Sequence, residues 1–307
     1  MLRERAIKKN KTNIYMYLMM APGLIYLLIN NYIPMAGIFI AFKSINYSKG
    51  IFKSDWIGLR NFEFLFRTSD AFVITRNTLL YNIAFIIIGN TLGIVLAIFL
   101  NELASRKLAS IYQTVLLLPS LVSMVIVSYL VYAFLSAENG YFNKTLLPLL
   151  GIGEIPWYST PKFWPYILIS VNEWRNVGFS AIIYLASVVG IDKSYYESAM
   201  IDGASKWTQV RTITLPLIRP TIIILVLMSI GTIFYSDFGL FYQVPLNSGM
   251  LFSVTSTLDT YVYRGLMQQN NISMSSAAGV YQSLVGFILV MLANFIVRKF
   301  DSENSLF

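Results

Sequence analysis

Long apolar runs separated by short polar segments dominate this sequence. Six runs are long enough for the ~20 residues that a helix needs to cross a bilayer, and they cover residues 14–42, 79–100, 115–135, 163–190, 221–241 and 277–297. Six crossings place both chain ends on the same side of a membrane. The pattern therefore predicts an all-α membrane protein with six transmembrane helices, in which residues 1–307 form a single transmembrane domain.

The first apolar run follows a basic N-terminus, so it has to be distinguished from a secretory signal. A signal peptide has an apolar region of about 7–15 residues that ends at a cleavage site with small residues. The run over residues 14–42 is far longer, and no such site ends it. We therefore interpret it as an uncleaved first span.

Basic residues indicate which side of the membrane the polar segments face. Lys and Arg are more frequent on the side that carries the two termini, and the loops on that side are shorter. Short cytoplasmic loops are enriched in these residues. We therefore expect a multi-pass protein of the cell membrane, with both termini and residues 191–220 in the cytoplasm and residues 43–76 outside.

The polar segment over residues 191–220 lies between the fourth and fifth apolar runs. Ser194 is suited to be the N-cap of a short helix, and Gly203 to a turn that needs a positive φ. A second helix over residues 206–213 would stop near Pro216. The segment therefore predicts a helix, a glycine turn and a second helix.

Two interpretations of this polar segment stay open on physical grounds. The small residues Ala199, Gly203 and Ala204 would allow close approach to a groove of another protein, where Glu197 would meet a basic partner. Alternatively, residues such as Trp207 would hold the helices on lipid headgroups.

Three charged side chains fall inside predicted spans, where an unpaired charge is costly. Glu173 and Arg175 lie in the fourth span, and Asp237 lies near the outer end of the fifth. Arg175 could pair with either acid and hold two spans together. It could also face a polar path through the membrane, and both interpretations stay open.

The fourth span also predicts a polar, aromatic-edged face. Asn172, Arg175, Asn176 and Phe179 follow the i, i+3, i+4, i+7 spacing of one helix face. Amide and guanidinium groups beside an aromatic ring suit a substrate rich in hydroxyl groups, such as a sugar. The fifth span supplies similar chemistry from Tyr235, Phe238 and Tyr242.

Composition narrows the functions that the chain can carry alone. Hydrophobic residues make up 56% of the chain and charged residues 12%, and the chain has no His and no Cys. It also lacks the Gly-x-x-x-x-Gly-Lys-Ser/Thr loop that cradles nucleotide phosphates. We therefore expect no catalysis and no cofactor in this chain. The net charge of +8 is spread among apolar runs, which does not favour a nucleic-acid partner.

Three short motifs in the polar segment resemble the cytoplasmic coupling loop of ABC importer permeases. They are Glu197-Ser198-Ala199, Asp202-Gly203-Ala204 and Ile213-Thr214-Leu215-Pro216. The segment departs from the family pattern at Ser198, where Ala is usual, and at Val210, where Phe is common. The resemblance implies the type I ABC importer permease fold. It also implies that the ATPase-coupling residues are Glu197, Ala199, Asp202, Gly203, Ala204, Leu215 and Pro216.

The resemblance extends over nearly the whole chain, to the oligosaccharide and polysaccharide branch of carbohydrate permeases. Its motifs are Tyr32-Ile33-Pro34-Met35, Gly58-Leu59-Arg60-Asn61-Phe62, Asn172-Glu173-Trp174-Arg175-Asn176-Val177-Gly178 and Thr260-Tyr261-Val262-Tyr263-Arg264. The resemblance implies a second permease subunit, two cytoplasmic ATPase subunits that use ATP and Mg²⁺, and an extracellular solute-binding lipoprotein. Together with the polar spans, it gives the expected substrate path as Asn172, Glu173, Trp174, Arg175, Asn176, Tyr235 and Asp237.

The expected function is therefore that of a permease subunit of an ATP-driven importer of oligosaccharides or polysaccharide fragments. The alternative is a non-transporting membrane sensor or scaffold that holds a cytoplasmic protein on the same polar loop. The sequence leaves open which saccharide is carried and whether it is acidic or neutral.

Overall fold

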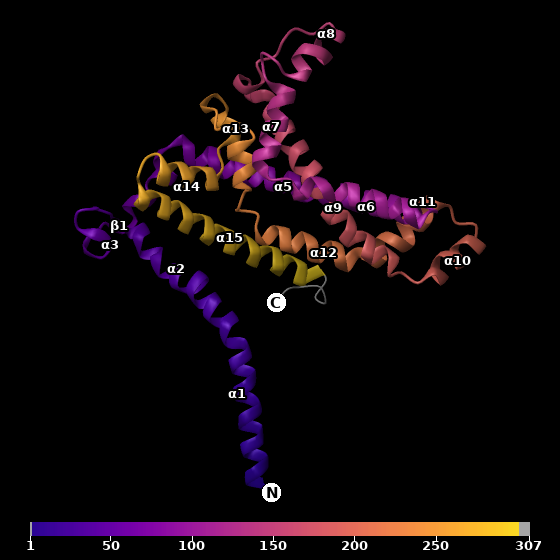
Figure 1. The fold of residues 1–307 in the computed structure, drawn as a ribbon, viewed down its shortest axis with the longest axis horizontal. Helices are drawn as coiled ribbons and strands as arrows, with labels where there is room; N and C mark the ends of the chain where they lie inside the picture. The colour runs from indigo at the N-terminus through magenta and orange to yellow at the C-terminus, as the bar shows by residue number, and fades with distance from the viewer. Residues whose placement is uncertain (1, 301–307) are drawn as a thin grey trace.

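The computed structural model describes residues 2–300 and is built almost entirely from helices (Figure 1). The side chains of residues 2–13, which include the basic N-terminal ones, lie outside the described part. The longer helices are α1 (Leu2–Leu27), α5 (Ser69–Glu102), α6 (Arg106–Leu121), α7 (Met124–Leu135), α9 (Trp164–Val189), α10 (Lys193–Ile201), α12 (Leu215–Gly231), α14 (Leu258–Met267) and α15 (Ile272–Phe300).

Short elements connect these helices. The two strands β1 and β2 pair antiparallel, with Lys43 opposite Trp56. The short elements are α2 (Ile33–Met35), β1 (Lys43–Ser44), α3 (Gly50–Lys53), β2 (Asp55–Trp56), α4 (Phe64–Arg67), α8 (Leu147–Leu149), α11 (Lys206–Gln209) and α13 (Phe252–Thr255). Among the π-helical turns are η7 (Val210–Thr214), directly before α12, and η8 (Gly239–Gln243).

Four helical stretches of the described chain are long and apolar enough to cross a membrane. They are Ile14–Phe42, Ser69–Glu102, Lys206–Gly231 and Ile272–Lys299. Two bent pairs of helices raise the number to six if each pair counts as one span: α6 with α7, and the α9 region with α10. The predicted all-α membrane fold is confirmed.

The third predicted span, residues 115–135, is not one straight helix. The chain bends by 96° between α6 and α7. Val122 has an extended backbone, and Ser123 caps α7 by accepting a hydrogen bond from the Ile126 amide. The sequence pattern did not predict this break, because the residues on both sides of it are apolar and hydropathy carries no signal for a helix cap.

The fifth predicted span, residues 221–241, is displaced along the chain. Its helix begins at Lys206 and ends at Gly231, and residues 232–237 follow without regular helix. Side chains of other helices hold this linker: Asn82 donates to the Tyr235 carbonyl at 3.0 Å and Gln282 to the Phe234 carbonyl at 2.7 Å. Irregular backbone at membrane depth is tolerated where protein groups satisfy its hydrogen bonds.

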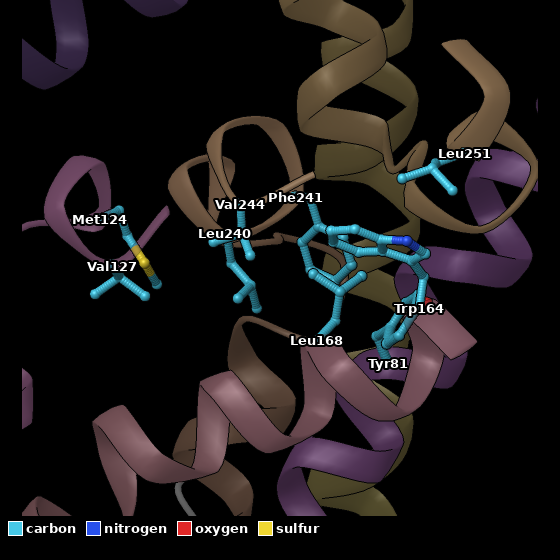
Figure 2. Packing of buried hydrophobic residues seen from close by; sticks show 9 residues of the cluster. All are labelled: Tyr81, Met124, Val127, Trp164, Leu168, Leu240, Phe241, Val244 and Leu251. Carbon is cyan, nitrogen blue, oxygen red and sulfur yellow. The ribbon is translucent and has the colours of Figure 1, made fainter. Parts of the chain in front are cut away.

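Two apolar clusters lie at different levels along α9. One gathers Trp164 and Leu168 of α9 with Leu240, Phe241 and Val244 around η8 (Figure 2). The other cluster packs the opposite end of α9 against α5 and α12 through Ala97, Leu100, Tyr184, Leu185, Val188 and Ile218. The polar stretch of α9 therefore lies between two closely packed apolar regions.

Small residues bring the neighbours of α9 very close. A Cβ atom added to Gly178 would lie 2.0 Å from the Leu116 carbonyl oxygen of α6. A Cβ atom added to Gly93 of α5 would lie 3.0 Å from the Ser180 Cβ. Helices pack closely in membranes where small residues allow their backbones to approach.

The first helix differs from the others because it leaves the bundle as an arm (Figure 1). Of the most apolar part of residues 14–42, which begin in this helix, only 6% is buried inside the chain. Almost all of its apolar surface is therefore uncovered by the rest of the described chain.

Candidate functional site

A polar cavity of about 380 Å³ lies between α5, α9 and α12, at the level between the two apolar clusters. Amide and hydroxyl side chains make up most of its polar lining. Phe85 and Phe179 add aromatic surface. The polar lining residues are Asn82, Asn90, Asn172, Glu173, Asn176, Ser180, Ser229 and Thr232.

A chain of hydrogen bonds along α9 orders one wall of the cavity. The Asn176 amide donates to the Asn172 side-chain oxygen at 3.0 Å, and the Asn172 amide donates to Glu173 Oε1 at 3.2 Å. Gly89 of α5 leaves space for the carboxylate, because a Cβ atom there would lie 3.0 Å from Glu173 Oε2. The three predicted residues of α9 are thus brought together.

Arg175 lies outside the cavity lining and pairs with an acid. Its Nη1 lies 3.4 Å from Asp237 Oδ2, so of the two predicted partners the structure selects Asp237 rather than Glu173. Asp237 Oδ1 also accepts the Leu240 amide of η8 at 3.1 Å. Of the expected face, Asn172, Asn176 and Phe179 line the cavity, and Arg175 meets Asp237 beside it. A role of Arg175 in a substrate path stays a prediction.

Two other predicted path residues lie away from the cavity. Trp174 is about half exposed on the outside of α9. Tyr235 lies in the linker after α12, and its hydroxyl is 3.4 Å from Ser283 Oγ. Phe238 stacks on Tyr242 with ring centroids 4.8 Å apart, and both rings contact Tyr263. A role in a substrate path stays a prediction for these residues.

The lining residues of α5 and α12 were not predicted. On α5 they are Asn82, Phe85, Ile86, Gly89 and Asn90, with the i, i+3, i+4, i+7, i+8 spacing of one helix face. That spacing was a readable signal within the second apolar run. The lining residues at the end of α12 show the same i, i+3, i+4, i+7 spacing; they are Leu225, Met228, Ser229 and the C-cap Thr232.

The polar segment after α9 begins with a different cap from the one predicted. Asp192, not Ser194, is the N-cap of α10, and its Oδ1 accepts the Ser194 amide at 2.9 Å. This backbone hydrogen bond to the charged form lowers the pKa of the Asp192 carboxyl. Asp and Ser are both good caps, and the helix simply starts two residues earlier.

The glycine turn is confirmed. Gly203 has a φ of +76°, and the Ala204 amide donates to the Ala199 carbonyl at 2.8 Å across the turn. A residue in the left-handed conformation just after a helix allows the following backbone amides to donate hydrogen bonds to the last carbonyl groups of the helix.

The second helix does not stop near Pro216. It runs from α11 through η7 into α12, so Lys206–Gly231 is one helical stretch. Pro216 stands in the first turn of α12 behind the π-helical turn, where its missing N–H is tolerated. The polar segment and the cavity wall therefore belong to one helix.

The polar segment exposes both charge and apolar surface. Glu197, Asp202 and Gly203 are exposed, as is Pro216, while Ala199, Ala204 and Leu215 are partly covered. Ile201 is 87% exposed and Trp207 71%. Two contacts fix the segment to the bundle: Lys206 pairs with Glu102 at 2.8 Å, and the hydroxyls of Tyr196 and Thr214 lie 2.9 Å apart.

Comparison with known proteins places this geometry in a family. Residues 89–302 match the family described as "Binding-protein-dependent transport system inner membrane component". The chain is 35% identical to Protein LplB of Bacillus subtilis (strain 168), over 97% of this chain and 92% of that protein. It is 36% identical to the polygalacturonan/rhamnogalacturonan transport system permease protein YteP of the same organism, over 98% and 93%.

Solved structures agree with these sequence matches. The chain superposes with a TM-score of 0.87 and 32% identity on a chain of a bacterial ABC transporter involved in the import of the acidic polysaccharide alginate, covering 97% of this chain and 99% of that one. A second structure of a bacterial alginate ABC transporter, in complex with an alginate pentasaccharide-bound periplasmic protein, matches with a TM-score of 0.85 and 32% identity, covering 95% and 97%.

Proposed function

The chain belongs to the family of binding-protein-dependent transport system inner membrane components, and from this membership and its cavity we infer how it serves as a permease subunit of a saccharide ABC importer. The cavity between α5, α9 and α12 is its part of the path for the sugar. This carries the proposal because amide groups, hydroxyls and aromatic edges inside an apolar bundle match a hydroxyl-rich substrate.

Asn172 and Asn176 hold the saccharide in this proposal. Their amides are ordered along one helix, so each can offer a fixed donor or acceptor to a sugar hydroxyl. Arg175 and Asp237 tie α9 to η8 beside the path, and Trp174 and Tyr235 lie on surfaces where a second permease subunit would pack. The uncovered apolar surface of α1 supports such a second membrane subunit.

The exposed polar segment is the docking site for a cytoplasmic ATPase subunit, which binds ATP and Mg²⁺ and performs the hydrolysis. Its protruding Ile201 and exposed Glu197 suit a groove with a basic residue better than a headgroup layer. Ala199, Asp202, Gly203 and Ala204 shape the turn, and Leu215 and Pro216 join it to the path. An extracellular solute-binding lipoprotein delivers the substrate. The sensor alternative has no support in the comparisons.

The test is ATP-driven saccharide uptake by the complete complex in proteoliposomes. Asn176→Ala should weaken saccharide-stimulated uptake about 5–10-fold, the effect of about one hydrogen bond, without changing the amount of assembled complex. Glu197→Gln should reduce uptake while the saccharide still binds.

Asn139→Ala and Glu138→Gln are the matched controls, since both residues are exposed in a loop remote from the cavity lining. Full uptake by Asn176→Ala would place the path elsewhere. Normal uptake by Glu197→Gln would show that docking does not need the charge of Glu197.

A further inference from the structure

The cavity lining carries an acidic side chain and no basic one among its described residues. Among the described residues that line the cavity, Glu173 is the one ionisable side chain, and none is Lys or Arg. Arg175 is next to it on α9 but turns to Asp237 outside the lining. A negatively charged sugar would therefore find no cation in this part of the path.

Glu173 is placed to act on a substrate rather than to hold helices together. It takes part in none of the five salt bridges found among the described residues. Oε1 accepts one hydrogen bond, from Asn172, and Oε2 occupies the space that the missing side chain of Gly89 leaves, with no hydrogen-bond donor beside it among the described residues. The carboxyl group keeps acceptor capacity toward the cavity.

We propose that this cavity selects uncharged saccharides and that Glu173 is the residue that determines this selectivity; the proposal rests on the saccharide-import function above. Glu173 accepts hydrogen bonds from sugar hydroxyls, and it rejects sugars that carry a carboxylate, such as uronates. The rejection has two causes: a carboxylate entering the cavity loses its water without gaining a counter-charge, and it approaches a second acidic group.

The proposal separates this chain from transport of polyuronates. Carboxylate recognition in proteins relies on Arg or Lys donors, most effectively in bidentate pairs. The lining offers instead the amides of Asn172 and Asn176 and the side-chain oxygen of Asn82, which pair with hydroxyls without a charge requirement.

The experiment compares saccharides with the same sugar backbone and different charge. The complete complex, purified in nanodiscs without its binding protein, is titrated with an oligogalacturonide and with the fully methyl-esterified form of the same oligomer. The wild type is expected to bind the ester at least about tenfold more tightly than the acid, the size of effect that one weakly screened like-charge contact produces. Glu173→Gln should reduce this ratio to about threefold or less by strengthening acid binding.

Glu138→Gln, an acid removed from an exposed loop, should keep the wild-type ratio. A wild-type complex that binds the acid as tightly as the ester overturns the proposal, whether or not Glu173→Gln assembles. An unchanged ratio in Glu173→Gln also overturns it.

ATP-driven uptake by the complete complex in proteoliposomes, with its binding protein, separates this failure from failure of the import function. Uptake that prefers the acid leaves the import function standing and removes the charge selectivity. Failure to bind or take up any saccharide, including a matched pair of glucose and glucuronate oligomers, would contradict both the import function and the charge selectivity.

Discussion

Gly203 shows how one residue governs the geometry of the polar segment. Its φ of +76° is strained for a side chain with a Cβ atom, yet no atom lies within 4 Å of where that Cβ would be. Backbone strain alone therefore decides what can replace it. Gly203→Val should cost about 1–2 kcal/mol in the local turn and displace α10 from α11, whereas Gly203→Asn should be tolerated because Asn adopts this conformation more readily.

The measurement for Gly203 is co-purification of the ATPase subunits together with saccharide-driven ATP hydrolysis. Val should lower both, and Asn should keep most of each. Equal behaviour of the two variants would show that the turn does not orient the docking surface.

Single residues were predictable where their signal lies in one short stretch. Gly203 could be predicted because only a positive φ explains a glycine between two helical patterns. Asn172 and Asn176 could be predicted because they are one turn apart. Asn82 was not predicted: the spacing of the α5 lining residues marks one face of that helix, but it does not show that this face meets α9.

Helix packing in this bundle depends on glycines that no side chain could replace. The Leu116 carbonyl of α6 occupies the position where a Gly178 Cβ would stand. Gly178→Ala should therefore force α6 from α9 and destabilise the folded protein by about 1–3 kcal/mol. Gly279→Ala on α15 is the matched control, because nothing lies within 4 Å of a Cβ there.

Thermal unfolding of the purified complex, followed by loss of soluble protein, tests this packing. Gly178→Ala should lower the midpoint clearly, and Gly279→Ala should leave it unchanged or raise it slightly. Similar midpoints for the two variants would contradict the close contact between α6 and α9.

Elements were predicted well by hydropathy, but their ends and bends were not. The 96° bend between α6 and α7 lies inside one apolar run. The helix of the fifth predicted span, α12, can end at Gly231 because the side chains of Asn82 and Gln282 donate hydrogen bonds to backbone carbonyl groups beyond it. Both features come from hydrogen bonds to particular partners, and an apolar run contains no information about them.

The orientation of the whole molecule follows from its distribution of basic residues and stays a prediction. The natural chain contains no Cys, so a single introduced Cys reports one position. Lys206→Cys should resist an impermeant thiol reagent in intact cells and react after permeabilisation. Lys49→Cys, exposed near β2, should react in intact cells. Labelling of the first variant in intact cells would reverse the topology.

The helix that joins the polar segment to the cavity has a mechanical consequence. From Lys206 to Ser229 it is about 35 Å long at about 1.5 Å per residue, so a tilt of about 5° about its cytoplasmic end would carry Ser229 through about 3 Å. That displacement equals the length of a hydrogen bond. If the polar segment docks an ATPase and the cavity holds a sugar, as proposed above, a lever of this length would convert a slight rocking of the docked end into the making or breaking of individual contacts to the sugar.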